Sequence, residues 1–405
     1  MVEVEPDFYL PDACWEHVFK FLNEDDKDNR SCLKSVSVVS KRFLTITNRL
    51  RSSLTICKKL NPFLTAIFHR FPNLTSITFS RLCGDRDTIL SQISSFPFNI
   101  ISLNLRSQIF IPVNGLRAFS QKIKSVTSLE CSDMNSISVT DLSLIADCFP
   151  LLEELHLNSI AIFRGNMLNG IETLSLALPK LRKVNLSSHT YMNDQLLFHL
   201  FNNWKLLEEV IIFGCLGITN AGIASALCVR PTLRSLSLTN YDENCITLLA
   251  IVRSCPSLSD IKIEYFPRFT NMNVDNSYSL KNFVSCFKVK LHGLNFEVPK
   301  LEVLNLSNTR IDNEELFLIS KSFRGLLELS LEVCYFVTKR GVNHVVENCT
   351  QLREINLRGC YKVHKNIVAS MISSRPSLRK IVVPPRYRFN NNEREHFIGN
   401  ICLLR

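Results

Sequence analysis

The sequence contains little glycine and no long apolar run. Glycine supplies 12 of the 405 residues, against the roughly 7% usual in proteins, which disfavours glycine-rich phosphate loops and collagen-like repeats. No stretch of 18 consecutive apolar residues occurs, so we expect no transmembrane helix. The first 30 residues are acidic and interrupted by charges, unlike a secretory signal. These absences favour a globular protein of the nucleus or the cytoplasm.

Motifs for catalysis and metal binding are also absent. The sequence has no H-E-x-x-H, no C-x-x-C pair, no Walker-type loop, no G-x-G-x-x-G and no G-x-S-x-G. It does contain 15 cysteines, but no two lie within nine residues of each other, and we interpret them as reduced thiols that fill the core. We therefore expect no cofactor, no metal site and no catalytic residue, and the protein is not expected to be an enzyme.

One apolar phrase recurs along most of the chain. An apolar residue is followed three positions later by a second and two positions after that by a third, as in Leu152, Leu155 and Leu157. The twelve copies begin at Leu74, Ile100, Val126, Leu152, Leu181, Leu207, Leu233, Leu258, Leu301, Leu326, Leu352 and Leu378. Successive copies are 25 or 26 residues apart, except for intervals of 29 and 43 residues. Such a regular period indicates a repeat architecture.

Each copy combines two spacings. The second and third apolar residues alternate with polar ones at period two, which predicts a short strand with one buried face. The rest of the unit has helical spacing, as at Leu142, Ile145 and Ala146. Neither element can bury its apolar face alone, so stacked strand-helix units are expected to share one core.

The phrase resembles the leucine-rich repeat, and the copies with Cys215, Cys334 or Cys360 at the fourth position resemble its Cys-containing subclass. The resemblance implies an α/β, horseshoe-shaped leucine-rich-repeat solenoid of about 12 strand-helix repeats with a parallel concave sheet. Ile160, His189 and Tyr241 depart from the pattern, so we expect an irregular internal hydrogen-bond ladder there.

The predicted domains follow from where the phrase occurs. We place the solenoid at residues 60–383 and a C-terminal tail or cap at 384–405. The 43-residue interval holds an aromatic-rich insert around 265–299. Inserts in solenoids often lie on the binding face, but an irregular repeat that packs its own aromatic rings is the alternative.

The first 59 residues lack the phrase and are helical in their spacing. Trp15, Val18, Phe19 and Leu22 lie at i, i+3, i+4 and i+7, with Asp12 as a possible N-cap. Two further apolar faces follow within residues 33–39 and 43–50. Three short helices make too small a core to be stable alone, so this segment is expected to need a partner or the adjacent solenoid.

The passages LPDACWEHVFKFL (10–22) and LKSVSVVSKRF (33–43) resemble an F-box. An F-box followed by leucine-rich repeats is similar to the plant F-box/LRR-repeat proteins. The resemblance implies a substrate receptor of a Skp/cullin/F-box ubiquitin ligase, with a Skp-family adaptor, and through it a cullin, as partners. Carried onto this sequence, it implies adaptor-binding residues at Leu10, Pro11, Val18, Leu22, Val39 and Phe43. In the alternative, the helices only cap the first repeat, and the protein is a ligase-independent binding scaffold or inhibitor.

The residues that alternate with the buried ones in each strand are expected to face the concave side. They include eight acidic and five basic residues, about −3, although the whole chain carries +10. This balance disfavours nucleic acid as the ligand, and no membrane partner is expected. We predict a protein target with a basic, partly apolar epitope, although any single carboxylate is better explained by solvation. The predicted target-binding residues are Glu154, His156, Glu209, Ile211, Phe213, Asp260, Glu264, Glu328, Glu332, Glu354 and Arg358.

Overall fold

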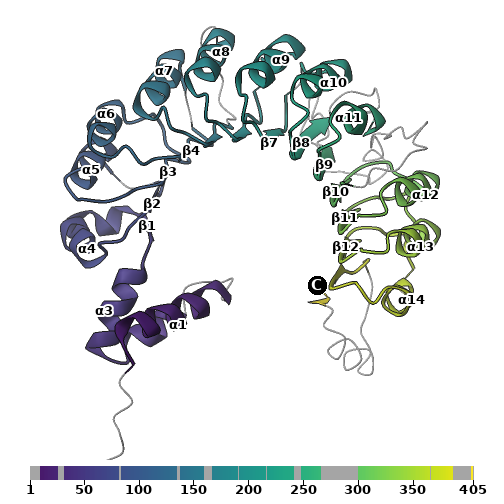
Figure 1. The fold of residues 1–405 in the computed structure, drawn as a ribbon, viewed down its shortest axis with the longest axis horizontal. Coiled ribbons are helices and arrows are strands. Elements are labelled where there is room, and N and C mark those ends of the chain that lie inside the picture. Colours follow the sequence, from purple (N-terminus) through teal and green to yellow (C-terminus); the bar gives the residue numbers. More distant parts are fainter. Residues whose placement is uncertain are drawn as a thin grey trace, which may run out of the picture. The chain divides into compact units, whose positions relative to one another are not determined.

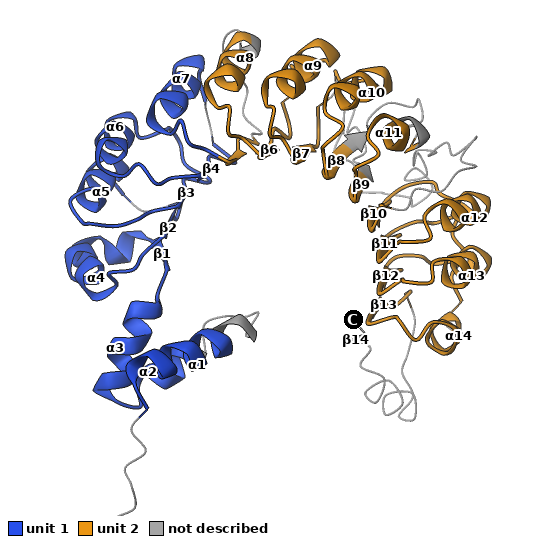
Figure 2. Ribbon diagram, in the orientation of Figure 1, with its two compact units in different colours: residues 1–152 blue, residues 153–405 orange. Residues whose placement is uncertain are grey.

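The computed structural model describes residues 10–25, 32–81, 84–134, 137–158, 167–189, 191–215, 217–240, 248–265, 300–364, 366–385 and 403–404. The chain divides into two compact units, Met1–Leu152 and Glu153–Arg405 (Figure 2). In both units short strands alternate with helices that lie on one side of the sheet (Figure 1). No helix in the described part of the chain is long and apolar enough to cross a membrane.

The first unit begins with three helices and continues as strand-helix repeats. Its helical elements are α1 (Asp12–Asp25), α2 (Cys32–Ser37), α3 (Lys41–Leu50), the 3-10 helix η1 (Lys58–Phe63), α4 (Leu64–Arg70), α5 (Arg86–Ile93), α6 (Val113–Lys122) and α7 (Val139–Cys148). Its strands are β1 (Ser53–Ile56), β2 (Ser76–Phe79), β3 (Ser102–Asn104) and β4 (Ser128–Glu130), which pair in parallel and in chain order.

The second unit consists of repeats of the same kind. Its strands are β5 (Glu154–His156), β6 (Lys183–Asn185), β7 (Glu209–Ile212), β8 (Ser235–Asn240), β9 (Asp260–Tyr265), β10 (Val303–Asn305), β11 (Glu328–Ser330), β12 (Glu354–Asn356), β13 (Lys380–Val382) and β14 (Leu403–Leu404). Its helices are α8 (Met167–Ala177), α9 (Asp194–Asn203), α10 (Asn220–Val229), α11 (Leu248–Ser254), α12 (Asn313–Ser322), α13 (Lys339–Asn348) and α14 (Ile367–Ser374). These strands also pair in parallel and in chain order.

The pairing register confirms the predicted repeat. The twelve phrases correspond to β2 through β13, and the second apolar residue of one phrase lies opposite that of the next, as Leu155 does opposite Val184. Leu155 and Leu157 are 0% and 1% exposed, so both apolar positions of this phrase are buried. Parallel strands in chain order, alternating with helices along most of the described chain, make the fold an α/β leucine-rich-repeat solenoid.

The sheet extends beyond the predicted repeats at both ends. Strand β1 lies before residue 60, where no phrase is recognisable. It still has the alternation of a repeat strand, because Leu54 and Ile56 are buried and alternate with exposed residues. Strand β14 lies within the predicted C-terminal tail and pairs with β13. The 43-residue interval leaves the ladder unbroken, since Asp260 lies opposite Val303, while residues 266–299 of the insert lie outside the described residues.

A buried ladder links the fourth positions of the repeats. The thiols of Cys215, Cys334 and Cys360 donate to a main-chain carbonyl of the preceding repeat at 3.3, 3.2 and 3.0 Å. At His189 the side chain differs from the cysteines but is also buried, at 1% exposed, and its Nδ1 lies 3.1 Å from the hydroxyl oxygen of Tyr191. Burial lowers the pKa of His189 to about 4, so the ring is neutral at pH 7. Ile160 and Tyr241 lie outside the described residues.

Candidate functional site

Helices α1 and α3 enclose a small aromatic core. The rings of Trp15, Phe19 and Phe43 have centroids 4.8 to 5.7 Å apart, and Phe19 is 2% exposed. Phe43, predicted from the resemblance as an adaptor contact, is half-buried and packs on both of the other rings. Its observed contacts therefore hold α3 against α1.

Ion pairs reinforce the contact between these helices. Asp12 accepts hydrogen bonds from Arg42 at 2.7 Å and Arg49 at 2.9 Å, and Glu16 lies 2.8 Å from Arg49. Arg42 also donates to the carbonyl of Leu10. Hydrogen bonds from the two guanidinium groups hold the pKa of Asp12 below its ordinary value. Arg42 of the F-box-like passage thus positions the start of α1.

Helix α3 also joins this segment to the first repeat. The side chain of Asn73 donates to the carbonyl of Arg49 at 2.9 Å, and Arg70 donates to the side chain of Asn48 at 3.2 Å. Ile46, near the same end of the helix, is 0% exposed. Contacts of α3 therefore cap the first repeat. They do not account for the exposed apolar residues of α1 and of the α2–α3 turn.

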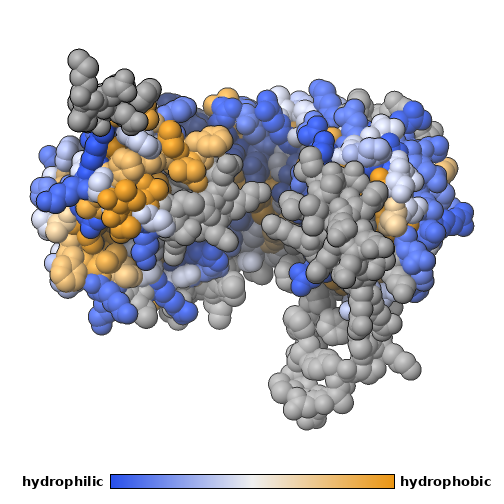
Figure 3. All heavy atoms as spheres, turned by 90° about the horizontal axis from the view of Figure 1, so that it is seen from below, coloured by the Kyte–Doolittle hydropathy of each residue, from blue (hydrophilic) through white to orange (hydrophobic). Residues whose placement is uncertain are grey.

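Those residues form what we call the helical apolar surface. It consists of Leu10, Val18, Phe21, Leu22, Val38 and Val39, which are 41%, 44%, 63%, 40%, 80% and 67% exposed. Hydrophobic side chains gather over the N-terminal helices in Figure 3. Pro11 is also exposed, so five of the six predicted adaptor-binding residues lie at the surface. Phe21 was missed, although its position three residues after Val18 could have indicated it.

A second candidate surface is the open face of the sheet in the second unit, opposite the helices. Two rows of side chains cross it in register. The first row is Glu154, Lys183, Glu209, Ser235, Asp260, Val303, Glu328, Glu354 and Lys380. The second is His156, Asn185, Ile211, Ser237, Lys262, Asn305, Ser330, Asn356 and Val382. The first row is mainly charged, and the second is mainly amide and hydroxyl.

The predicted target-binding residues fall on these two rows or just beyond them. Phe213, Glu332 and Arg358 each stand two residues after a strand residue of the second row, in the turn that leaves β7, β11 or β12. Glu264 lies in β9, where the structure describes its backbone. Register therefore brings the residues onto one face, but it does not tell which of them are available to a partner.

Side-chain contacts show that three of the predicted carboxylates on β5 to β9 are already paired: Glu154, Glu209 and Asp260. The ammonium nitrogen of Lys183 lies 3.1 Å from Glu154 and 3.8 Å from Glu209. Its hydrogen bond to Glu154 holds the pKa of Lys183 above its ordinary value. Asp260 is paired with Lys262 of its own strand at 3.1 Å.

The carboxylates on β11 and β12 differ from one another. Lys380 binds Glu354, and Arg358 lies 3.8 Å from Glu332, which also accepts a hydrogen bond from Asn356 at 3.1 Å. Glu328 is exposed and forms no ion pair with any described residue. Of the predicted acidic residues on this face whose side chains the structure describes, Glu328 is the one without an ion pair.

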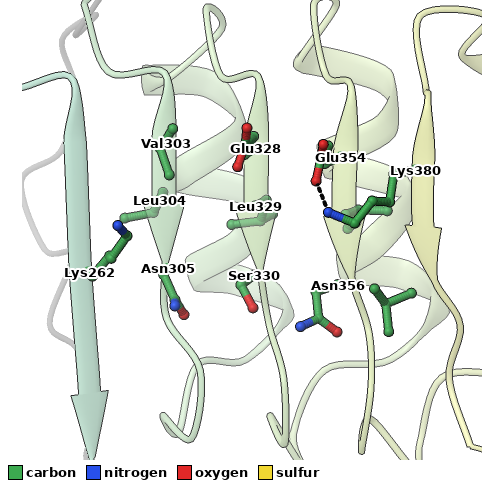
Figure 4. A pocket seen from close by; sticks show the side chains of 12 residues that line it. Lys262, Val303, Leu304, Asn305, Glu328, Leu329, Ser330, Glu354, Asn356 and Lys380 are labelled. Atoms are coloured by element: carbon green, nitrogen blue, oxygen red, sulfur yellow. Dashed lines mark hydrogen bonds and ion pairs between the residues drawn. The ribbon is translucent and has the colours of Figure 1, made fainter. Parts of the chain in front are cut away.

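A pocket of about 210 Å³ lies on the open face around Glu328 (Figure 4). It is lined by Lys262, Val303, Leu304, Asn305, Glu328, Leu329, Ser330, Glu354, Ile355, Asn356, Lys380 and Val382. In Figure 4, Glu328 stands between Val303 and Glu354, and Asn305, Ser330 and Asn356 form the row beside it. Among the described residues there is no group of His, Cys, Asp and Glu side chains that could hold a metal ion. The groups in this pocket can form ion pairs and hydrogen bonds with a ligand.

No known family model matches the sequence. Among solved structures, the chain is similar to one in the crystal structure of the Rad7 and Elc1 complex in yeast, with 14% identity, 97% of this chain and 92% of that chain covered, and a TM-score of 0.46. It is also similar to the leucine-rich repeat-containing protein LegL7 from Legionella pneumophila, with 14% identity, 73% and 96% covered, and a TM-score of 0.44. The fold assignment rests on the strand order and register described above.

Proposed function

We propose that this protein is the substrate-recognition subunit of a Skp/cullin/F-box ubiquitin ligase. In this proposal the helical apolar surface binds the Skp-family adaptor, and the open face of the repeats binds a target protein. Ubiquitin transfer is assigned to other subunits, and this chain contributes proximity between target and enzyme. We propose that it acts in the nucleus or the cytoplasm.

The helical apolar surface is the observation that carries the adaptor part. A helical cap would bury its apolar side chains against the solenoid, whereas Val18, Phe21 and Val39 remain exposed beside an aromatic core that is already filled. Contiguous exposed apolar side chains mark protein-binding sites. The F-box-like passages place the expected adaptor contacts on this same surface, which supports the proposal over a scaffold without an adaptor.

Purified Skp adaptor and the full chain provide the test. We expect the double substitution V18D/L22D to weaken adaptor binding at least 100-fold, because it places two carboxylates in an apolar interface. Phe63→Asp is the matched control, since Phe63 is also apolar and 61% exposed but lies on η1. We expect that control to change the Kd less than twofold. Circular dichroism checks that both variants fold.

This experiment distinguishes an adaptor-binding helical segment from one that only caps the repeats. Adaptor binding by V18D/L22D at the wild-type affinity, or no adaptor binding by the wild-type chain, would favour the ligase-independent scaffold. Target binding by the repeats would survive in that case, because the open face does not depend on the adaptor.

The open face supports the target-binding part. Nine strands, β5 to β13, lie side by side, and at about 4.8 Å per strand the rows run roughly 38 Å along the sheet. This length suits a folded domain or an extended segment of a protein better than a small metabolite. Side chains of the second row offer hydrogen bonds, and those of the first offer charge.

A further inference from the structure

We infer that the pocket around Glu328 receives a basic side chain, arginine or lysine, from the partner protein. That side chain would lie against Val303 with its cation on Glu328. The inference rests on the proposed target-binding role of the repeats, and it names the chemistry by which the target is recognised.

Lys183 shows what such a cation does on this same sheet. It stands in register between two acidic residues, Glu154 on β5 and Glu209 on β7, and its ammonium nitrogen approaches both carboxylates. Opposite charges directly across neighbouring strands stabilise a sheet, and like charges destabilise it. A lysine between two glutamates therefore lies within ion-pair distance of both carboxylates.

The row at β10 to β13 lacks the equivalent lysine. Glu328 lies directly opposite Glu354 on the adjacent strand, so two carboxylates stand side by side. Glu354 is paired with Lys380 of the next strand, β13. Glu328 has Val303 of the preceding strand, β10, as its other neighbour. Folding alone gives no reason for this pair of like charges, and a cation from a partner would compensate for it.

The remaining charges of the pocket favour a cation over an anion. Lys262 and Lys380 are each matched by their own partner, Asp260 and Glu354. After these two pairs are set aside, the pocket keeps one negative charge, on Glu328. Val303 beside it offers an apolar surface for the methylene groups of a long basic side chain.

The second row adds a place for the partner's backbone. The side-chain oxygen of Asn305 accepts hydrogen bonds from the main-chain N–H and the hydroxyl of Ser307, at 2.9 and 2.6 Å. This fixes the orientation of the amide, so its NH₂ group is left as a donor next to the hydroxyl of Ser330. An extended segment whose basic side chain reaches Glu328 can present a carbonyl oxygen to this row.

The test uses the full chain and a displayed library of random 12-residue peptides. Peptides selected on the wild-type chain are sequenced, and their Kd values are measured by fluorescence anisotropy. The same peptides are titrated against Glu328→Gln, which removes the charge, and Val303→Lys, which supplies a cation from within the sheet. Glu314→Gln is the matched control, because Glu314 is an exposed acidic residue on α12 outside the pocket.

We expect the selected peptides to share an arginine or lysine position and to bind Glu328→Gln and Val303→Lys at least tenfold more weakly. We expect binding to Glu314→Gln to stay within twofold of wild type. Selection of no peptide, of peptides without a shared basic residue, or of peptides indifferent to both pocket substitutions would overturn the inference. Adaptor binding by Glu328→Gln is measured in parallel: if it equals that of the wild type while peptide binding fails the test, the inference falls and the proposed adaptor role stands.

Discussion

On β5 to β7 a lysine stands between two glutamates, whereas on β10 to β12 two glutamates stand side by side and a valine occupies the place next to them. Both stretches belong to one sheet and share one register. In the first, both carboxylates already lie within 4 Å of the ammonium group of Lys183. The second keeps Glu328 available. The comparison shows that charge counted along a repeat sequence overstates the charge a partner meets, because neighbouring strands neutralise one another.

The same two stretches also differ beneath the surface. In the β6 repeat the fourth position is His189, whereas in the β11 and β12 repeats it is Cys334 and Cys360. Burial lowers the pKa of the imidazole to about 4, and it raises the pKa of Cys360 to about 12. Both groups are therefore neutral at pH 7, but mild acid can charge the imidazole alone.

The largest expected effect is a loss of stability in acid that depends on His189. Its pKa of about 4 in the folded chain lies below the ordinary value of 6.5, so the unfolded chain binds the extra proton first. The resulting stability is present above pH 6.5 and falls by about 3 kcal/mol as the pH drops towards 4. His189→Gln should flatten this part of the pH profile, since Gln108 fills the same position in the first unit. Equal pH profiles in urea unfolding would contradict the expectation.

The next effect concerns the turn after β11. Val333 has a φ of +61°, as do residues at the same position of other repeats, such as Asn308 at +60° and Gly359 at +74°. A β-branched residue in the left-handed region is strained by roughly 1 to 3 kcal/mol. Val333→Asn should therefore raise the free energy of unfolding by about 1 kcal/mol. The reverse change, Asn308→Val, is its control and should lower it; equal stability of both variants and the wild type would refute the idea.

A smaller effect should follow from removing the lysine that contacts both glutamates on β5 to β7. Lys183→Met leaves Glu154 and Glu209 without their shared cation. Because these side chains are 34% to 46% exposed, the loss should be below about 1 kcal/mol and should shrink at high salt. The variant should also gain weak binding of the basic peptides selected on the wild type. A loss of stability that is the same at low and high salt would speak against an ionic origin.

The smallest expected effect comes from adding a lysine on β10 next to Glu328. Val303→Lys places a cation beside Glu328, and we expect it to raise the free energy of unfolding by about 0.5 kcal/mol or less. The double variant V303K/E328Q tests the cause, because the lysine then has no free carboxylate to meet. If both variants gain the same stability, the carboxylate of Glu328 is not what the lysine contacts.

Much of the fold could be predicted from the sequence because one period repeats. The phrase indicates which residues are buried, and its nearly constant spacing indicates how β2 to β13 pair. Strand β1 and strand β14 lie outside any complete phrase, so only pairing with a neighbouring strand reveals them. His189 was expected to interrupt the ladder because its side chain differs from Cys, and the structure shows that the ring is nevertheless buried at that position and lies beside the hydroxyl of Tyr191.

The candidate sites were less predictable for a different reason. Alternation places Glu209 and Glu328 on one face, but whether a carboxylate is free depends on the length and position of side chains on the neighbouring strands. For Phe43, helical spacing and family resemblance do not decide between an outward and an inward ring. The contact with Trp15 settles that its ring packs inside.

Hydrogen–deuterium exchange of the full chain, alone, with purified Skp adaptor, and with a selected basic peptide, tests most directly the claim that two separate surfaces bind two kinds of partner. The adaptor should protect amides of α1 and α2 and leave β10 to β12 unchanged, whereas the peptide should do the reverse. Protection of β10 to β12 by the adaptor, or no protection of α1 by it, would contradict the assignment.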